Sequence, residues 1–311
     1  MKFARFFKRR KKGPVSENKS LFSIGVFKGK SPFGLSPSGK GLNPVLTRED
    51  VSDAKALLVA DPFMLRVENT WYMFFEVLNR STGKGEIGLA KSGNAFEWHY
   101  QKIVLAEPFH LSYPYVFQWE DEFYMIPETA RTYSIQLFRA KNFPFGWALA
   151  GTLLSNQRFA DSSIIYHNEK WWLFTETNPD LKHDTLRVFY AESLYGIWKE
   201  HPSSPVIQGN PHIARPAGRV FSYDGRLVRY AQDCYPTYGT QVSAFFVELT
   251  EDVYSEKEVP DNPVLSPSGS GWNAHGMHHV DPHLVKDGEW VACVDGWIGV
   301  DSLVYNRDSH D

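Results

Sequence analysis

The hydrophobic and polar positions of this 311-residue chain follow one short pattern five times. Each copy has an apolar run, a polar turn with Asp, Glu, Asn or Gly, and a second aromatic or apolar run, which is typical of a β-hairpin. The copies are ADPFMLRVENTWYMFFE from Ala60, SYPYVFQWEDEFYMIPE from Ser112, ADSSIIYHNEKWWLFTE from Ala160, ARPAGRVFSYDGRLVRYAQ from Ala214 and VDPHLVKDGEWVACVDG from Val280.

The spacing of the hairpins indicates how they assemble. They start near Asp61, Tyr113, Asp161, Arg215 and Asp281, which are 52, 48, 54 and 66 residues apart. Each interval holds the four short strands of a propeller blade, and no helical period runs between the hairpins. We therefore predict an all-β fold, a five-bladed β-propeller. A β-sandwich, the alternative, would not explain five copies.

The two ends of the chain predict how the ring closes. About 30 residues follow Asp281, enough for three strands of a fifth blade. Asn43–Leu46 matches Ser204–Ile207 and Asn262–Leu265, which precede the fourth and fifth hairpins. We expect Asn43–Leu46 to be the outer strand of the fifth blade, so that an N-terminal strand closes the ring and leaves no open edge. Residues 20–311 then form one propeller, and residues 1–19 form a basic, disordered tail.

Charge is distributed unevenly. Residues 1–12 carry seven Lys or Arg and no acid, which leaves 26 basic against 36 acidic residues in the rest, a net charge of −10. An acidic body excludes nucleic acid as the main partner. The tail either attracts an anionic membrane surface or is a solubilising end. The sequence shows no apolar leader, no stretch long enough to span a membrane and no disulfide framework, so we expect a cytoplasmic protein. If the tail binds an anionic membrane surface, the protein would be peripheral at that membrane.

The hairpins bring acidic residues to one end of the propeller. Facing residues of an antiparallel pair have a constant sum of residue numbers. The predicted pairs are Asp61 with Glu76, Tyr113 with Glu128, Asp161 with Glu176, Asp281 with Asp295, and Arg215 with Gln232 or Asp233. The first strand of every blade lines the channel and all first strands run the same way, so these residues are expected to converge at one mouth.

Converging carboxylates suit acid and base chemistry. Like charges at close range raise one another's pKa values, which allows a protonated and an ionised carboxyl group to share a site. The structural alternative is that each acid caps a turn or accepts a backbone N–H. Trp71, Trp119, Trp171 and Trp172 are expected to pack between blades.

Histidines form a second candidate cluster, with four of them between His275 and His283. Alternation along a strand places His279, Asp281 and His283 on one face. Hydrogen bonding of a substrate by His279 is favoured over a divalent metal there, because the separated ligand spacing of a zinc site is missing. We expect no cofactor. His110 precedes a first strand, where a loop reaches the mouth.

The strand starts resemble those of the five-bladed propeller glycosidases, such as arabinanases, xylosidases and invertases. Members of that group begin the first blade with an Asp that acts as base or nucleophile and carry a second essential Asp in the middle of the propeller. Asp61 in VADPF and Asp161 in FADSS stand in those places. The arabinanase-like general acid is a Glu that begins a later blade. Arg215 begins the fourth blade here, so the resemblance implies that Glu128 or Glu176 would be the acid.

A longer match resembles the propeller-like N-terminal domain of plant glucosamine inositolphosphorylceramide transferases and its stand-alone bacterial relatives. It runs from Asn43 to Gly218 through NPVLTREDV, VADPFML, WYMFFE, FHLSYPYVF, YMIPE, FADSSI, WWLFTET and ARPAG. The recognised glycosyltransferase domain of the plant proteins lies further along their chains. The resemblance therefore implies a glycan or glycolipid setting without assigning a reaction.

These observations favour an enzyme that makes or breaks a glycosidic bond in polysaccharide or glycolipid metabolism. Asp61 would be the base or nucleophile, Asp161 would steady the cationic transition state, and Glu176 or Glu128 would be the acid. Arg215 suits a phosphate or carboxylate of the substrate. The expected substrate-binding residues are Glu76, His110, Tyr113, Arg215, His279, Asp281 and Asp295. The alternatives are a non-catalytic glycan-binding module that assists a partner glycosyltransferase, and a protein-interaction scaffold.

Overall fold

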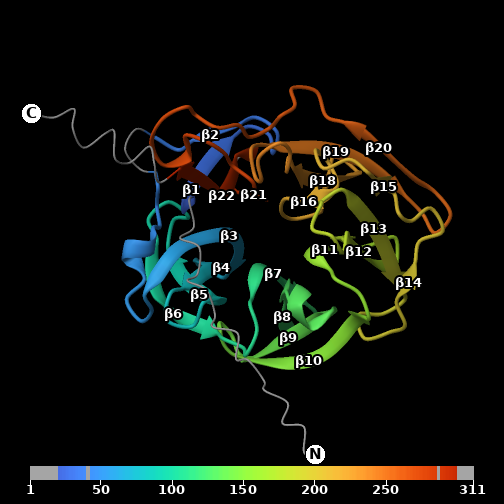
Figure 1. The fold of residues 1–311 in the computed structure, drawn as a ribbon, viewed down its shortest axis with the longest axis horizontal. Helices are drawn as coiled ribbons and strands as arrows, with labels where there is room; N and C mark the ends of the chain where they lie inside the picture. Colours follow the sequence, from blue (N-terminus) through green and yellow to red (C-terminus); the bar gives the residue numbers. More distant parts are fainter. Residues whose placement is uncertain (1–19, 40–42, 286–287, 300–311) are drawn as a thin grey trace, which may run out of the picture.

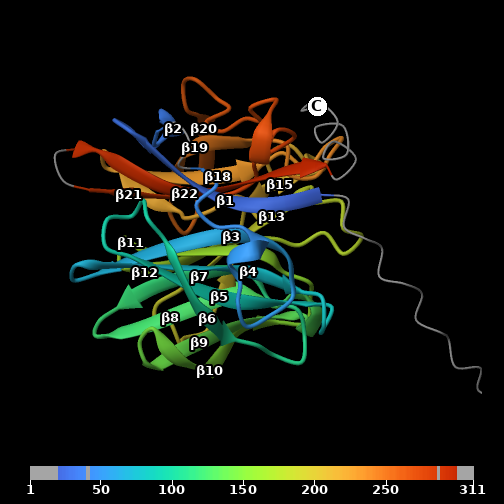
Figure 2. The ribbon, with the colours of Figure 1, turned by 90° about the vertical axis from the view of Figure 1, so that its left-hand side faces the viewer.

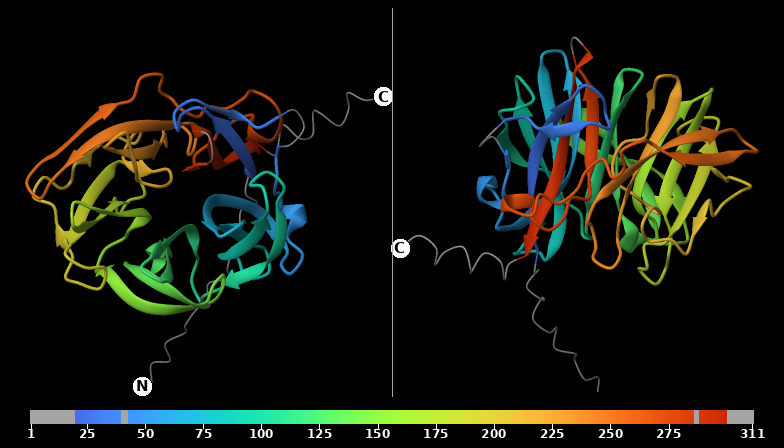
Figure 3. Two further views of the ribbon diagram at one scale, coloured as in Figure 1. Left: turned by 180° about the vertical axis from the view of Figure 1, so that it is seen from behind. Right: turned by 90° about the horizontal axis from the view of Figure 1, so that it is seen from above.

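Five antiparallel sheets are arranged in a ring in the computed structural model of the chain (Figure 1). The structure describes residues 20–39, 43–285 and 288–299. Seen from the side, the sheets lie next to one another around the ring (Figures 2 and 3). The fold is a five-bladed β-propeller, as the sequence predicts. The predicted tail at residues 1–19 lies outside the described residues.

Blades 1 to 3 follow one another along the chain. Blade 1 consists of β3 (Ala56–Val67), β4 (Thr70–Asn79), β5 (Lys84–Ser92) and β6 (His99–Leu105). Blade 2 consists of β7 (Ser112–Trp119), β8 (Glu122–Glu128), β9 (Ser134–Asn142) and β10 (Phe145–Ser155). Blade 3 consists of β11 (Ala160–His167), β12 (Lys170–Glu176), β13 (Thr185–Ala191), and two short outer strands, β14 (Lys199–Glu200) and β15 (Ile207–Gln208).

Blades 4 and 5 are less regular. The inner strand of blade 4 is split, because two short strands both pair with β18. Blade 4 consists of β16 (Arg215–Pro216), β17 (Phe221–Tyr223), β18 (Arg226–Gln232), β19 (Val242–Leu249) and β20 (Tyr254–Glu258). Blade 5 consists of β21 (Val280–Leu284), β22 (Trp290–Gly299), β1 (Ser20–Gly29) and β2 (Leu35–Pro37).

Helical structure within the described ranges is limited to single turns. The three 3-10 helices are η1 (Arg48–Asp50), η2 (Ala130–Thr132) and η3 (Gly271–Asn273). Among the residues that the structure describes, none of the helices has the length and apolar character needed to cross a membrane.

The N-terminal segment closes the ring, although through other residues than predicted. β1 pairs with β22 over its whole length, from Ser20 opposite Gly299 to Gly29 opposite Trp290. β2 then pairs with β1 at the outside of the blade. Asn43–Leu46, the predicted outer strand, makes only an isolated bridge from Leu46 to β1. The prediction of this strand was wrong because the N-terminal segment supplies both the third strand, β1, and the outer strand, β2, of blade 5.

The likeness between Asn43–Leu46 and its two counterparts reflects a repeated contact. In each segment the residue before a cis proline exchanges hydrogen bonds with the backbone N–H and C=O of one residue in the third strand of a blade. The pairs are Asn43 with Val26, Ser204 with Val188 and Asn262 with Ala244. The sequence repeat therefore marks where the chain returns along the outside of a blade.

A β-bulge near the start of the inner strand shifts the predicted pairing. In blade 1, Ala60 faces Glu76, and pairing resumes only where Phe63 faces Phe74. The extra residue breaks the constant sum of residue numbers. The observed pairs Ala60–Glu76, Ser112–Glu128 and Ala160–Glu176 correct three predictions in this way. In blade 5 the pairing is regular, and Asp281 faces Cys293 instead of Asp295, which corrects a fourth. Arg215 faces Gln232, as predicted.

The hydrophobic core lies between neighbouring blades. Side chains of blades 1, 2 and 3 share one cluster, and the interfaces of blades 3 with 4, 4 with 5 and 5 with 1 each have another. Trp71, Trp171 and Trp172 are buried in these clusters, and Trp119 packs against the first of them. The prediction that these four residues pack between blades is confirmed.

Candidate functional site

Three residues at corresponding places in blades 1 to 3 have a left-handed backbone. The φ angle is 53° at Asp61, 44° at Tyr113 and 48° at Asp161, and each residue lies in the bulge of its inner strand. This conformation costs a residue with a Cβ about 1–3 kcal/mol, and it persists only where the surroundings hold it. Such positions gather at functional sites, so they mark this mouth of the channel as the candidate site.

Carboxylates of the preceding blade hold these strand starts. The backbone N–H of Asp61 donates to Asp295 of blade 5 over 2.9 Å, and that of Tyr113 donates to Asp61 over 3.2 Å. The N–H of Asp161 donates to Glu128 over 3.3 Å. Each of these acids therefore has a structural role, whatever chemistry it also performs.

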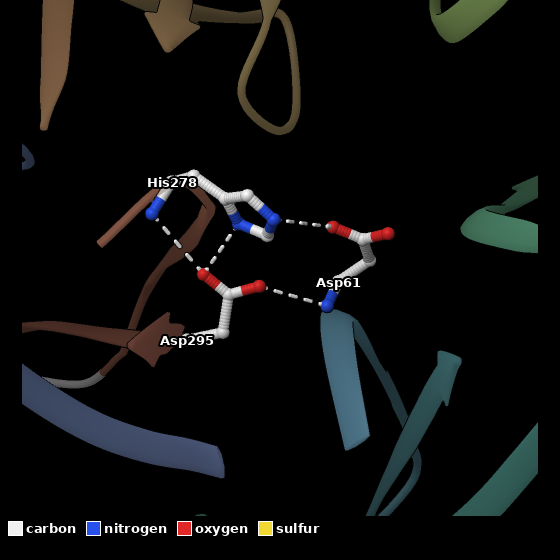
Figure 4. Close-up of side chains that lie close together, drawn as sticks. All are labelled: Asp61, His278 and Asp295. Carbon is white, nitrogen blue, oxygen red and sulfur yellow. Dashed lines mark hydrogen bonds and ion pairs between the residues drawn. The ribbon is translucent and has the colours of Figure 1, made fainter. Parts of the chain in front are cut away.

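Asp61, His278 and Asp295 form a compact buried cluster (Figure 4). Nδ1 of His278 lies 2.7 Å from Oδ1 of Asp295, and its Nε2 lies 3.9 Å from Oδ1 of Asp61. Burial disfavours a charged ring, but the attraction of Asp295 is stronger and the pKa of His278 rises to about 9. His278 is therefore a buried cation between two carboxyl groups.

Arg215 holds the second Asp of the mouth. Its Nε donates to Oδ2 of Asp161 over 2.6 Å, and Gln232 donates to the same oxygen over 2.8 Å. Nη1 of Arg215 lies 2.8 Å from Nδ1 of His183, and Nη2 lies 3.4 Å from Glu128. Burial opposes ionisation of Asp161, but attraction to Arg215 prevails and keeps the pKa of Asp161 below its usual value.

The pKa values of three glutamates in the second strands of blades 1 to 3 shift in the opposite direction. Glu128 and Glu176 end β8 and β12, and Glu76 lies three residues before the end of β4. Burial, with the charge of Asp161, raises the pKa of Glu128 to about 8. Burial also raises the pKa values of Glu76 and Glu176. Oε1 of Glu76 lies 3.3 Å from Nε2 of His110, a ring whose pKa burial lowers to about 4.

The mouth therefore holds carboxyl groups in both protonation states. Burial raises the pKa of Asp61 to about 7, although His278 opposes the shift. Burial also works against ionisation of Asp295, yet the pKa of Asp295 is lowered because His278 is so close. An ionised Asp161 thus lies beside a protonated Glu128. General acid and base catalysis needs such a pair of unlike carboxyl groups in one site.

A cavity of about 430 Å³ opens at the mouth. The predicted site residues that line it are Asp61, Glu76, His110, Glu128 and Arg215. Asp161 lies behind Arg215. Glu176 is fully buried, with its carboxylate 3.4 Å from Nη1 of Arg158. Neither of these two acids lines the cavity.

Asp281 belongs to a different cluster, away from this cavity. Its carboxylate accepts hydrogen bonds from Nε of Arg219 over 2.6 Å and from the N–H of Met64 over 2.6 Å, and it lies 2.9 Å from Nε2 of His283. Met64 is three residues along β3 from Asp61, so the structure places Asp281 deeper in the channel. The expected convergence of the three first-strand Asp residues is limited to Asp61 and Asp161.

His279 and Tyr113 also lie inside the channel. Both nitrogens of the fully buried His279 ring lack a hydrogen-bond partner among the described residues, and burial lowers its pKa to about 4. The Tyr113 hydroxyl accepts from the N–H of Gly218 over 2.6 Å and lies 2.9 Å from Oγ of Ser163. These side chains pack the channel behind the mouth.

One group of side chains in the described part of the chain brings donor atoms close enough together to hold a metal ion. Donor atoms of Asp61, His278 and Asp295 all lie within 4.8 Å of one another, and His279 is not among them. However, Nδ1 of His278 is bonded to Asp295 and the ring is protonated at neutral pH, so a metal would have to displace that proton. The donor set fits a buried ion pair better than a metal centre.

Sequence reasoning missed His278 and Tyr238, which line the mouth cavity, and Arg158 and His183, which contact residues beside it. His278, Arg158, His183 and Tyr238 lie in irregular segments between strands, where no hydrophobic period places side chains. The run of histidines between His275 and His283 was the only signal for His278. Strand alternation could not identify it, because β21 begins at Val280.

Comparison with known proteins identifies relatives along almost the whole chain. The family model described as glucosamine inositolphosphorylceramide transferase 1, N-terminal, matches residues 15–297. The chain is 36% identical over 307 residues to glucosamine inositolphosphorylceramide transferase 1 of Oryza sativa subsp. japonica, and 36% identical over 305 residues to that of Arabidopsis thaliana. Each alignment covers 91% of this chain but only 41% and 40% of these relatives.

Among solved structures, a candidate glycoside hydrolase from Bacteroides ovatus matches with a TM-score of 0.63. The match covers 86% of this chain and 98% of that chain at 12% identity, so it bears on the fold alone. The sequence matches show more than a shared fold, because 36% of the aligned residues are identical and the matched region includes all five blades. The chain belongs to the family of the N-terminal region of glucosamine inositolphosphorylceramide transferase 1.

Proposed function

We propose that the chain is a carbohydrate-active enzyme that makes or breaks a glycosidic bond in polysaccharide or glycolipid metabolism. The observation that carries the proposal is the presence of two unlike carboxyl groups in one cavity. Burial raises the pKa of Glu128 to about 8 and that of Asp61 to about 7, so at neutral pH the first is protonated and the second is partly ionised. The names of the curated relatives support a glycolipid setting.

The proposed roles follow from which residues line the cavity. Glu128 donates its proton to the oxygen of the bond that breaks, and Asp61 either takes a proton from the attacking hydroxyl or attacks the sugar carbon itself. Glu76 and His110 bind the sugar. Asp161 does not reach the cavity, so we assign it a positioning role through Arg215.

Residues behind the cavity have supporting roles in this proposal. Asp295 orients His278, whose positive charge favours the ionised form of Asp61. Glu176 is fully buried beside Arg158 and does not line the cavity, so we do not propose it as the general acid. Tyr113, His279 and Asp281 form the channel wall. The reaction proposed here uses no metal or organic cofactor.

A non-catalytic glycan-binding module is the second candidate. The observation that favours it is that Asp61, Asp295 and Glu128 each hold a backbone N–H of the next blade, which gives these acids a reason to be present without catalysis. In that case the chain would position a glycan for a partner glycosyltransferase. We keep a cytoplasmic location at an anionic membrane surface as part of the proposal, with the basic residues 1–12 outside the described part.

Turnover and binding on a panel of glycans, activated glycosides and sugar nucleotides test these two candidates. Wild type is compared with Asp61→Asn and Glu128→Gln. The control is Glu122→Gln, a half-exposed carboxylate in β8, the strand of Glu128. The enzyme predicts turnover that falls by about 10²–10⁴-fold in the first two variants and not in the control. Saturable binding without turnover, retained in Asp61→Asn, would establish the binding module instead.

A further inference from the structure

A second cavity of about 640 Å³ adjoins the mouth on the side of blades 2 and 3. It shares His110 and Glu128 with the mouth cavity, so these two residues border both spaces. Its other lining residues come from the loops that follow β8, β10 and β12. We call this space the arginine groove, because two arginines, Arg131 and Arg158, line it.

The charges of the arginine groove are unbalanced. Arg131 makes no hydrogen bond or ion pair with any other residue that the structure describes, and Arg158 has a single 3.4 Å contact with Glu176. Glu128 is the one carboxylic acid in the lining, and burial raises its pKa to about 8, so it is mostly neutral at pH 7. His110 is neutral as well, because burial and the charge of Arg131 lower its pKa to about 4.

The remaining walls are apolar and unusually exposed. Tyr133 is 62% exposed and Leu181 is 55% exposed, and both have a left-handed backbone, with φ of 54° and 60°. Together with Pro179 they leave few polar groups in the lining to pair with the guanidinium groups. The groove therefore presents two cations to whatever fills it.

We infer that the arginine groove is a subsite for an anionic substituent, a phosphate or a carboxylate, of the saccharide bound at the mouth. The inference rests on the proposed function, because the anion is part of the same substrate. A guanidinium group presents a planar fork of donors that matches both anions. Arg215 was the residue expected to do this from the sequence, but it is engaged with Asp161, His183 and Glu128. Arg131 has no such partner among the described residues, and Arg158 has only its 3.4 Å contact with Glu176, so these two arginines are better placed for that role.

Calorimetric titration of the full chain with glucose, glucose 6-phosphate, glucuronate and inorganic phosphate tests the inference. The two charged sugars are expected to bind at least about tenfold more tightly than glucose, since hydrogen bonds to charged groups are the strong ones. Arg131→Gln and Arg158→Gln should each remove most of that difference and leave glucose binding unchanged. Arg139→Gln is the matched control, because this arginine lies in the same blade but pairs with Glu122 outside the groove.

The outcomes separate this inference from the proposed reaction. The sugar of higher affinity identifies the anion as phosphate or carboxylate, and raised salt should weaken its binding. Equal affinities for all three sugars, an equal effect of the Arg139→Gln control, or no binding of any of the four probes would each overturn the subsite. Binding of inorganic phosphate as tightly as glucose 6-phosphate would show an anion site unconnected to the saccharide and would also overturn it. Loss of turnover in Asp61→Asn alongside any of these results would leave the proposed function standing.

Discussion

Arg215 and Asp161, 54 residues apart in the sequence, share a hydrogen bond of 2.6 Å, and both side chains are almost completely buried. The pair joins the inner strands of blades 3 and 4. It also acts on the protonation of the mouth. The charge of Asp161 adds to burial in raising the pKa of Glu128, and the charge of Arg215 partly opposes this shift. One ion pair therefore contributes both to the ring and to the chemistry of the site.

Replacing Arg215 alone with Met should destabilise the propeller more than replacing both Arg215 and Asp161. The variant leaves a buried carboxylate without a cation, which costs about 3–5 kcal/mol in the free energy of unfolding. Because Arg215 lowers the pKa of Asp161 in the folded state, the stability that the pair provides is present above the unfolded pKa and lost as pH falls. Urea unfolding of Arg215→Met beside the double variant with Asp161→Asn measures this. A double variant as unstable as the single one would contradict the account.

Glu128 should make the fold less stable as pH rises. Its pKa is about 8 in the folded chain, because it is buried, and about 4.3 in an unfolded one. Between about pH 5 and 7 unfolding releases its proton, so the free energy of unfolding falls by about 1.4 kcal/mol per pH unit from this group. Glu128→Gln should flatten the slope by that amount in urea unfolding at several pH values. Glu122→Gln, on the surface of the same strand, is expected to follow wild type, and a slope unchanged in Glu128→Gln would refute the assignment.

His278 should control the ionisation of Asp61. Burial raises the pKa of Asp61 to about 7, and the positive charge of His278 keeps it from rising further. His278→Gln removes that charge, so the pKa of Asp61 should increase by about one unit or more. Titration of the Asp61 carboxyl group by ¹³C NMR measures the shift without relying on turnover. His275→Gln, three residues away and exposed, is the control, and an Asp61 titration that stays in place in His278→Gln would count against the cluster.

Tyr113 should matter for stability and not for substrate affinity. Its fully buried hydroxyl accepts the N–H of Gly218, and Tyr113→Phe would leave this N–H without a partner. An unsatisfied buried donor costs about 1–3 kcal/mol, which urea unfolding can detect. Saccharide binding by calorimetry should stay the same. Weaker binding with full stability would instead restore the substrate contact expected from the sequence.

The repeat of the hairpins was predictable because each one carries its own local pattern. Alternation and a polar turn appear in every copy, and five copies leave the propeller as the simplest closed arrangement. The closing strand was not predictable in the same way. Ser20 pairs with Gly299, and no local feature of Ser20–Gly29 indicates a partner so far along the chain. Asn43–Leu46 was predicted to be the closing strand because its sequence repeat is visible. That repeat instead marks where the chain returns along the outside of a blade.

The sequence was enough to predict those residues of the candidate site that lie on strands. Asp61, Glu76 and Glu128 reach the mouth because strand ends in a propeller meet there, even though a bulge shifts their pairing. His278 and Arg131 could not be assigned, because they lie in segments without a period. Asp281 was misplaced because its strand starts at a different depth from the strand of Asp61.

The pairing of β1 with β22 sets the order in which the blades can form during synthesis. The strand that completes blade 5 is among the first parts of the described chain to leave the ribosome, whereas its partner is made some 270 residues later. At a translation rate of about 5–20 residues per second, β1 waits for tens of seconds with an unpaired edge. Blades 1 to 4 can form in that interval, but the last one requires both ends at once. Newly made chains are therefore exposed to pairing with one another until translation has passed Gly299.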